Sequence, residues 1–318
     1  MTEQLKKNNS YRLLKFLSKQ PIQLLRFFAR GLAGFVNLLK VSKTSETIRL
    51  NLKIALPELN DAEREKITRA AIRNELTAYF EFFSIWGTEN QQNIARIENV
   101  FGASLMQNAL QENKGLVLIV PHFGTWEIMN AYIAQFTEMT IMYKPVKNAA
   151  ANQFVLAARS REQAHLVPTD ERGVRQIFKA LKSGGTTVIL PDHSPHHDSE
   201  LIPYFGVPLS SSNLSAKLIQ KTKAKALFLY AMRNQNGLFD MHIESVDEAI
   251  YQGTANEATA IIHQSLEQLI LRYPEHYHWS YKRFRAHPHL HRIYDQPQEK
   301  SLAQVHAVRA EYQASLKN

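Results

Sequence analysis

The sequence contains no cysteine. Disulfides, thiolate metal sites and cysteine nucleophiles are therefore excluded, and the absence is consistent with a reducing compartment. The chain also has no internal repeat and no low-complexity tract, and its aromatic residues follow no nucleic-acid-binding motif. We therefore expect no nucleic acid among its partners. With 318 residues, 44% of them hydrophobic, the chain is long and apolar enough to bury a substantial core.

An uninterrupted hydrophobic run that could span a membrane is also missing. The most apolar stretch, residues 22–39, contains Arg26 and Arg30, and an arginine at the centre of a spanning helix costs about 2.5–3.5 kcal/mol. No small-residue cleavage site follows it, so a secretory signal is not indicated. We predict a basic helix that lies in the membrane interface, with both arginines reaching towards headgroups. An ordinary amphipathic helix packed on its own core is the alternative.

Acidic residues are scarce in the first 60 positions. This segment holds eleven Lys and Arg against three acids, a net charge of +8, whereas the whole chain carries +9. Such an excess favours anionic partners, among them anionic lipid, phosphorylated sugars and an acidic carrier protein. We predict that residues 1–45 form a basic, membrane-anchoring helical segment and that residues 46–318 form an α/β domain.

Apolar strands alternate with helical patterns along most of the chain. This alternation predicts an α/β fold with a mixed sheet flanked by helices, preceded by the membrane-associated helical segment. We expect strands at 116–120, 139–143, 165–167, 186–190, 226–232 and 238–246, and helices at 8–39 (broken near Pro21), 61–83, 126–135, 150–163, 174–181, 211–223, 255–272 and 303–316.

The stretch Gly115–Glu127 carries the strongest indication of chemistry. Its apolar residues predict a strand that stops at Pro121, and Gly124 marks a turn into a helix. His122 and Glu127 therefore lie where a strand ends and a helix begins, which is where open α/β sheets bind substrates. An imidazole removes protons near neutral pH, and a carboxylate holds it and stabilises its charged form. The alternative is a loop histidine near an unrelated glutamate that suits the helix dipole.

His122-Phe-Gly-Thr-Trp-Glu127 has the His-x4-Glu form of the lysophospholipid acyltransferase superfamily. More narrowly, the chain resembles the lipid A biosynthesis secondary acyltransferases of Gram-negative bacteria, the lauroyl and myristoyl transferases. The motif alone is weak, but the ordered set of similar blocks is specific. These blocks are Leu50–Leu59, Tyr143–Pro145 with Ala158-Arg159, Leu190–Ser194, Pro203–Pro208 and Trp279–Phe284. Asp192-His193 and Ser160–Glu162 depart from the family pattern, which leaves the substrate subtype open.

The resemblance implies transfer of a lauroyl or myristoyl chain from acyl-acyl carrier protein to a hydroxyl of a lipid A precursor, completing lipid A acylation. It implies His122 as the base, Glu127 as its partner, and Arg159 as a contact to the oxyanion or a phosphate. No metal or diffusible cofactor is required. The expected partners are acyl carrier protein, the lipid A precursor and anionic lipid, on the cytoplasmic face of the inner membrane.

Other polar residues follow predicted strands. Lys144 is a candidate phosphate contact, and Asp192 could orient Arg159 or His122, or cap a turn. The His-rich loop that continues through His193 to Asp198 matches no standard zinc spacing, so we expect no metal there. Four lysines between Lys217 and Lys225 form either a solvated face or a dock for the acidic carrier protein. Rival activities are a glycerophospholipid acyltransferase and a metal-dependent hydrolase that uses the His-rich loop. A non-catalytic rival is a basic membrane-surface or nucleic-acid-binding protein, which explains the charge but not His122, Glu127 and Asp192 at predicted strand ends.

Overall fold

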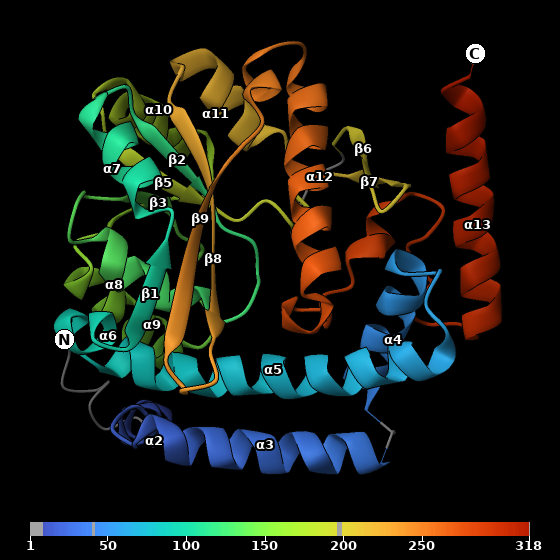
Figure 1. Cartoon of the computed structure of the whole chain (residues 1–318), viewed down its shortest axis with the longest axis horizontal. Coiled ribbons are helices and arrows are strands. Elements are labelled where there is room, and N and C mark those ends of the chain that lie inside the picture. The colour runs from blue at the N-terminus through green and yellow to red at the C-terminus, as the bar shows by residue number, and fades with distance from the viewer. Residues whose placement is uncertain (1–8, 40–41, 196–198, 318) are drawn as a thin grey trace. The chain divides into compact units, whose positions relative to one another are not determined.

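The structure is a computed structural model that describes residues 9–39, 42–195 and 199–317 (Figure 1). The chain divides into two compact units, each assembled from three segments. The first unit contains Met1–Gly31, Leu76–Ile189 and Lys221–Ser245, and the second contains Leu32–Glu75, Leu190–Gln220 and Val246–Asn318. The α/β class is confirmed, because helices flank a mixed sheet. The boundary near residue 45 stays a prediction.

A five-stranded mixed sheet forms the centre of the first unit, in the order β1-β9-β8-β2-β5. Strand β2 (Leu116–Ile119) is parallel to both of its neighbours, β5 (Thr186–Ile189) and β8 (Lys225–Arg233). Strand β9 (Phe239–Ser245) is antiparallel to β8, and β1 (Ile97–Phe101) is parallel to β9. All four residues of β2 are buried, as expected for an apolar strand between two parallel neighbours. The strand predicted at 116–120 is therefore confirmed.

Short elements continue this unit beyond β5. Strands β3 (Thr140–Met142) and β4 (His165–Val167) form a parallel pair, and a bridge between Met139 and Thr186 joins them to β5. The helix predicted at 126–135 begins as a 3-10 turn, η1 (Trp126–Ile128), and continues as α8 (Met129–Ile133). The other helices wholly within the unit are α2 (Asn9–Ser18), α6 (Asn90–Ile94), α7 (Ala103–Gln111), α9 (Ala149–Arg161) and α10 (Glu171–Lys182).

The second unit is mostly helical and contains a hairpin that the sequence patterns did not predict. Strands β6 (Leu201–Tyr204) and β7 (Val207–Ser210) pair through Phe205 and Gly206, which both have positive φ, as a tight two-residue turn requires. Its remaining elements are α4 (Lys43–Ala55), the first half of α5 (Asp61–Gly87), most of α11 (Leu214–Thr222), η2 (Glu248–Tyr251), α12 (Ala255–Arg272), η3 (Pro274–His276), η4 (Arg283–Ala286) and α13 (Gln298–Ser315).

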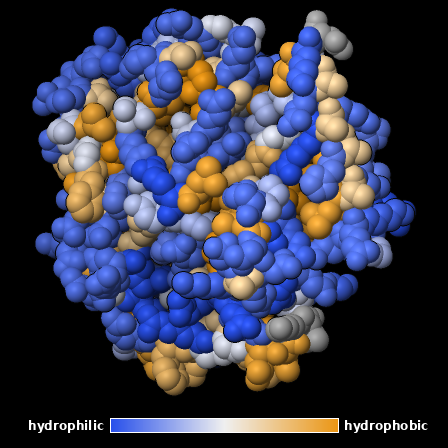
Figure 2. Space-filling model, turned by 45° about the vertical axis from the view of Figure 1, so that its right-hand side comes forward, coloured by the Kyte–Doolittle hydropathy of each residue, from blue (hydrophilic) through white to orange (hydrophobic). Residues whose placement is uncertain are grey.

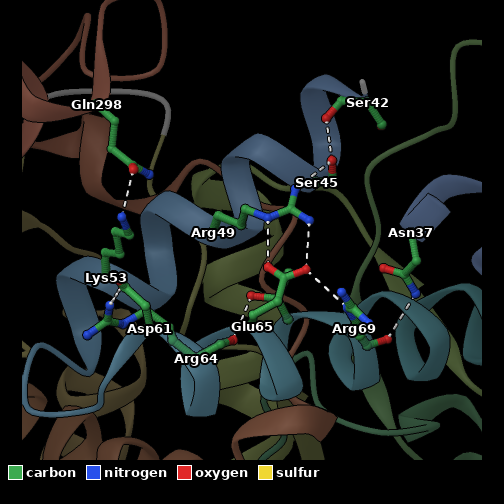
Figure 3. A network of polar contacts seen from close by, with 11 residues as sticks. Asn37, Ser42, Ser45, Arg49, Lys53, Asp61, Arg64, Glu65, Arg69 and Gln298 are labelled. Carbon is green, nitrogen blue, oxygen red and sulfur yellow. Dashed lines mark hydrogen bonds and ion pairs between the residues drawn. The ribbon is translucent and has the colours of Figure 1, made fainter. Parts of the chain in front are cut away.

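A polar network joins α4 to α5 in the second unit (Figure 3). The guanidinium of Arg49 donates to both carboxylate oxygens of Glu65 at 3.1 and 3.3 Å, and Arg69 donates to the same carboxylate at 3.1 Å. Lys53 donates to Gln298 at 2.9 Å, which links α4 to the start of α13. Arg49 and Lys53, both counted in the basic excess of the first 60 residues, therefore serve internal contacts.

Helix α3 (Ile22–Leu39) has a buried face and an apolar exposed face. It is the one helix of the described residues that is long and apolar enough to cross a membrane, by length and composition alone. Its inner face buries Leu25, Arg26, Ala29 and Ala33. Large apolar side chains remain exposed on the other side, and Figure 2 shows hydrophobic groups protruding at the lower edge of the molecule, where α3 lies. They are Leu24, Phe27, Phe28, Leu32, Phe35, Leu38 and Leu39.

The prediction that Arg26 reaches towards lipid headgroups is wrong. Its side chain is 1% exposed, and its Nε donates to Glu81 Oε1 at 2.6 Å. Nη1 donates to the carbonyl of Gly237 at 2.6 Å. Inside a protein, carboxylates and carbonyls replace the water around a guanidinium, and Glu81 and Gly237 do so here for Nε and Nη1. Arg30 on the same helix is exposed, as predicted.

Candidate active site

The turn that carries His122 follows strand β2 and is attached to Ala231 of the central strand β8. Gly124 forms a bridge with Ala231, and the N–H of Thr125 donates to the Ala231 carbonyl at 3.0 Å. Gly124 has φ +55°, and a Cβ at this position would lie 2.0 Å from the Ala231 oxygen. Only glycine allows this approach, so the turn is fixed against β8. His122 is half-buried, and its ring lies edge-on to Trp126 with centroids 4.9 Å apart.

Glu127 lies in the 3-10 turn that follows, and its carboxylate is held from several sides. Oε2 accepts a hydrogen bond from Trp86 Nε1 at 2.8 Å and a longer one from Asn130 Nδ2 at 3.4 Å. Oε1 accepts from Arg159 Nη2 at 2.8 Å. The residue is 5% exposed. A buried carboxylate with such partners has a defined orientation.

Arg159, near the end of α9, bridges two carboxylates. Its Nη2 binds Glu127 and its Nη1 donates to Glu162 Oε2 at 2.8 Å. Burial lowers the pKa of this guanidinium, but the charges of Glu127 and Glu162 outweigh that effect and raise its pKa above the ordinary value. Burial also raises the pKa of Glu162, against the opposing charge of Arg159. The Arg159 contact to substrate stays a prediction, and the structure adds a contact to Glu127.

Trp86 and Glu162 were missed as site residues by the sequence analysis. Trp86 lies on α5, 41 residues before Glu127 in the chain, and no local motif marks it. Glu162 was noted only as part of a departure from the family pattern. Lys144 lies exposed in the loop after β3, as predicted for a residue that meets an anion, and its phosphate contact stays a prediction.

Asp192 belongs to the second unit, although it follows β5 of the first unit in the chain. It is 1% exposed, and its charge acts on the buried groups Tyr204, Tyr277 and Arg283. Its role towards Arg159 or His122 stays a prediction. His193 is exposed and stacks on the ring of Tyr281 at 3.8 Å.

Three sequence blocks that carry the resemblance meet around Arg283 in the second unit. Its Nη1 donates to Ser194 Oγ at 3.1 Å and to the Ser210 carbonyl at 3.0 Å, next to the hairpin block Pro203–Pro208. Its guanidinium also lies over the Tyr204 ring at 5.7 Å. The blocks 190–194, 203–208 and 279–284 therefore build one buried polar cluster, in which desolvation by burial lowers the pKa of Arg283.

Metal ligands are not gathered in the part of the chain that the structure describes. Among residues 9–39, 42–195 and 199–317, no group of three or more His, Cys, Asp or Glu side chains could hold an ion. His196, His197 and Asp198 of the predicted His-rich loop lie outside the described residues. The structure joins the buried carboxylate of Glu127 to the guanidinium of Arg159, and it places the half-buried imidazole of His122 five residues earlier in the same turn.

Comparisons with known proteins cover most of the chain. The chain is 24% identical over 275 residues to a lipid A biosynthesis acyltransferase of Haemophilus influenzae, a match that covers 84% of this chain and 86% of the relative. It is 23% identical over 249 residues to the lipid A biosynthesis palmitoleoyltransferase of Escherichia coli, covering 77% of this chain and 80% of that one. The lauroyltransferase of E. coli is 22% identical over 258 residues, covering 80% and 83%.

The family model for bacterial lipid A biosynthesis acyltransferases matches residues 11–286, which include the turn that carries His122 and all the blocks quoted above. The chain therefore belongs to the bacterial lipid A biosynthesis acyltransferase family and is an acyltransferase of lipid A biosynthesis.

Proposed function

We propose that this acyltransferase takes its acyl chain from acyl-acyl carrier protein and transfers it to a hydroxyl of a lipid A precursor, as a secondary acyltransferase. The observation that carries the proposal is the placement of His122 at the end of β2, five residues before a buried Glu127 that Trp86 and Arg159 hold. The acyl chain is lauroyl or myristoyl. Related enzymes are named for lauroyl, myristoyl and palmitoleoyl transfer, so assays should include all three donors.

The chemistry follows from these groups. His122 takes the proton from the acceptor hydroxyl as its oxygen attacks the thioester carbonyl carbon. A C–O bond forms, the C–S bond breaks, and the imidazolium returns the proton to the departing thiolate. Glu127 stabilises the positive imidazole. The oxyanion is stabilised by backbone N–H groups of the turn or by Arg159, while Lys144 and Asp192 contribute to substrate binding.

We expect purified protein to transfer a chain from acyl-acyl carrier protein to a lipid A precursor, and to do so after exhaustive chelation. The ester-forming step proposed above uses an imidazole base and requires no Lewis acid or diffusible cofactor. Mass spectrometry of the product gives the added mass, and fragmentation gives its position. Transfer to glycerophospholipids in place of lipid A precursors would favour the rival acyltransferase. If the protein contains a stoichiometric metal, loses activity when that metal is removed and regains activity when it is added back, the metal-dependent hydrolase would be favoured.

Helix α3 supports a location at the cytoplasmic face of the inner membrane. Because Arg26 binds Glu81 inside the first unit, the buried face of α3 is committed to the protein and only the opposite, apolar face is available to lipid. An interfacial helix fits this arrangement better than a crossing one. The exposed Arg30 adds attraction to anionic lipid, and the exposed Lys217 and Lys221 on α11 support an acidic partner such as acyl carrier protein.

Replacing Phe27, Phe28 and Phe35 of α3 with serine should release the protein from vesicles that contain anionic lipid. Each ring is more than half exposed, and burying a phenylalanine contributes about 1.5–3 kcal/mol. We therefore expect the partition coefficient to fall at least about 100-fold. Flotation of both proteins with vesicles measures it. The matched control replaces Phe101, Phe136 and Leu201, which are also exposed but lie outside α2 and α3. Equal binding by both triple variants would place the anchor elsewhere.

A further inference from the structure

The second half of α5 contacts three consecutive residues of the catalytic turn, Thr125–Glu127. Glu81 Oε2 accepts a hydrogen bond from Thr125 Oγ1 at 2.7 Å. The ring of Phe82 packs edge-on against Trp126 with centroids 4.6 Å apart, and Trp86 donates to Glu127 at 2.8 Å. Phe82 and Trp86 are four positions apart and lie on one face of the helix, and Glu81 lies about 100° around the helix from Phe82. One rigid element therefore supports the turn along its length.

Glu81 is the most tightly held of these residues. It is fully buried, and its carboxylate accepts hydrogen bonds from Arg26 Nε at 2.6 Å and from Arg233 Nε and Nη2 at 2.7 and 3.0 Å, besides the one from Thr125. Burial raises the pKa of the Glu81 carboxyl, but the hydrogen bonds and charge of Arg233, the charge of Arg26 and the hydrogen bond from Thr125 outweigh it and bring the pKa below its ordinary value. Glu81 is therefore a fixed anion that joins α3, α5, β8 and the turn.

We propose that Glu81 is a positioning residue for the acyl-transfer reaction: through Thr125 it fixes the catalytic turn, and through Arg26 it connects that turn to α3. The proposal rests on the proposed function of His122 and Glu127. Thr125 is the residue before the 3-10 turn that carries Glu127, and its hydroxyl bond to an immobile carboxylate selects one side-chain rotamer. His122 and Glu127 lie three residues before and two residues after this anchored position.

The connection to α3 gives the proposal a second consequence. The same helix presents apolar side chains to its surroundings and places Arg26 on the carboxylate that anchors the turn. A shift of α3 that lengthens the Arg26–Glu81 contact changes how Glu81 binds Thr125. The position of α3 is therefore transmitted to the orientation of the turn through two hydrogen bonds, Arg26–Glu81 and Thr125–Glu81.

The Thr125→Val variant tests the positioning role. Valine keeps the shape of threonine and removes the hydroxyl, so we expect kcat to fall about 10- to 100-fold, as misplacement of reacting groups by a fraction of an ångström produces, with KM within about twofold. Thr125→Ser restores the hydroxyl and should recover most of kcat. Thr187→Val is the matched control, because that buried hydroxyl also donates a 2.7 Å hydrogen bond, to the Thr140 carbonyl. It should lower the melting temperature with kcat unchanged.

A wild-type kcat in Thr125→Val, or an equal loss in Thr125→Val and Thr187→Val, would overturn the positioning role. His122→Ala separates this result from failure of the proposed function. If His122→Ala is inactive while Thr125→Val is fully active, only the role of Glu81 is wrong. If His122→Ala is active, the proposed function itself is wrong.

A double-mutant cycle tests the connection to α3. If Arg26 acts on the turn through Glu81 and Thr125, then Arg26→Met and Thr125→Val disrupt the same interaction. The kcat of the double variant should then lie within about twofold of the kcat of the less active single variant. Multiplied losses would overturn the connection. Arg26→Lys, which keeps the charge and loses the Nε hydrogen bond, replaces Arg26→Met in the cycle if the methionine variant does not fold.

Discussion

We expect His122→Ala to lose acyl transfer by a factor of about 10²–10⁴ while the protein stays folded, because an alcohol attacks a thioester slowly without a general base. The imidazole is half-buried, and the backbone of its turn is attached to Ala231 through Gly124 and Thr125. Removing it leaves the attachment of the turn intact. Single-turnover assays with acyl-acyl carrier protein measure the chemical step directly.

The control for this variant is His165→Ala. His165 is an exposed histidine of the same unit, on β4, and its Nε2 lies 3.3 Å from Gln176 Oε1. The His165→Ala variant should transfer acyl chains at the wild-type rate. Turnover near the wild-type rate in a folded His122→Ala variant would refute the base assigned above.

Arg159→Met should destabilise the protein at neutral pH by about 3–5 kcal/mol and reduce turnover, because it leaves Glu127 and Glu162 buried without their shared cation. The difference in stability between Arg159→Met and the wild-type protein should become smaller as the pH falls. Burial raises the pKa of the Glu162 carboxyl above 4.5, so ionisation of this group lowers the stability of the folded protein as the pH rises through the folded-state pKa. The charge of Arg159 opposes this loss of stability. Thermal melts from neutral pH down to about 4.5 measure the difference between the two proteins.

The Arg159→Lys variant separates charge from geometry in this experiment. A lysine keeps a positive charge beside the two carboxylates but lacks the planar fork that binds both of them at 2.8 Å. Compared with Arg159→Met, the Arg159→Lys variant should recover part of the lost stability and a smaller part of the lost turnover. A methionine variant whose deficit stays the same at every pH would show that the charges of Glu127 and Glu162 do not account for the role of Arg159.

Local patterns were sufficient to predict the strand ends that carry the site. The apolar run before Pro121 predicted β2, and the glycine after His122 predicted the turn, because both depend on residues close in sequence. The partners of the site come from far away in the chain. Trp86 lies 41 residues from Glu127, and Arg233 lies 152 residues from Glu81. The hydrophobic pattern of a single helix or strand cannot predict which residues from distant parts of the chain will be in contact.

Two elements show why the remaining features were not predicted. In α3, Arg26 lies in an apolar stretch, which from the sequence alone predicts a residue at a membrane surface. Only the folded structure shows that it binds Glu81 on α5. In the hairpin β6–β7, Pro203 and Pro208 face each other across the pair. Proline within a strand normally argues against a central strand, and it is tolerated here because the sheet has only two strands, both of them at its edge.

The division of each unit into three separate segments has a consequence for synthesis of the protein. Arg26 requires Glu81, and Glu81 in turn requires Arg233, which is 207 residues after Arg26. At about 5–20 residues per second, a ribosome needs roughly 10–40 s to make that stretch. During this interval the apolar side chains of α3 have emerged, while the ionic centre that holds the helix is incomplete. A chaperone or a membrane surface that covers α3 in this period would protect the nascent chain from aggregation.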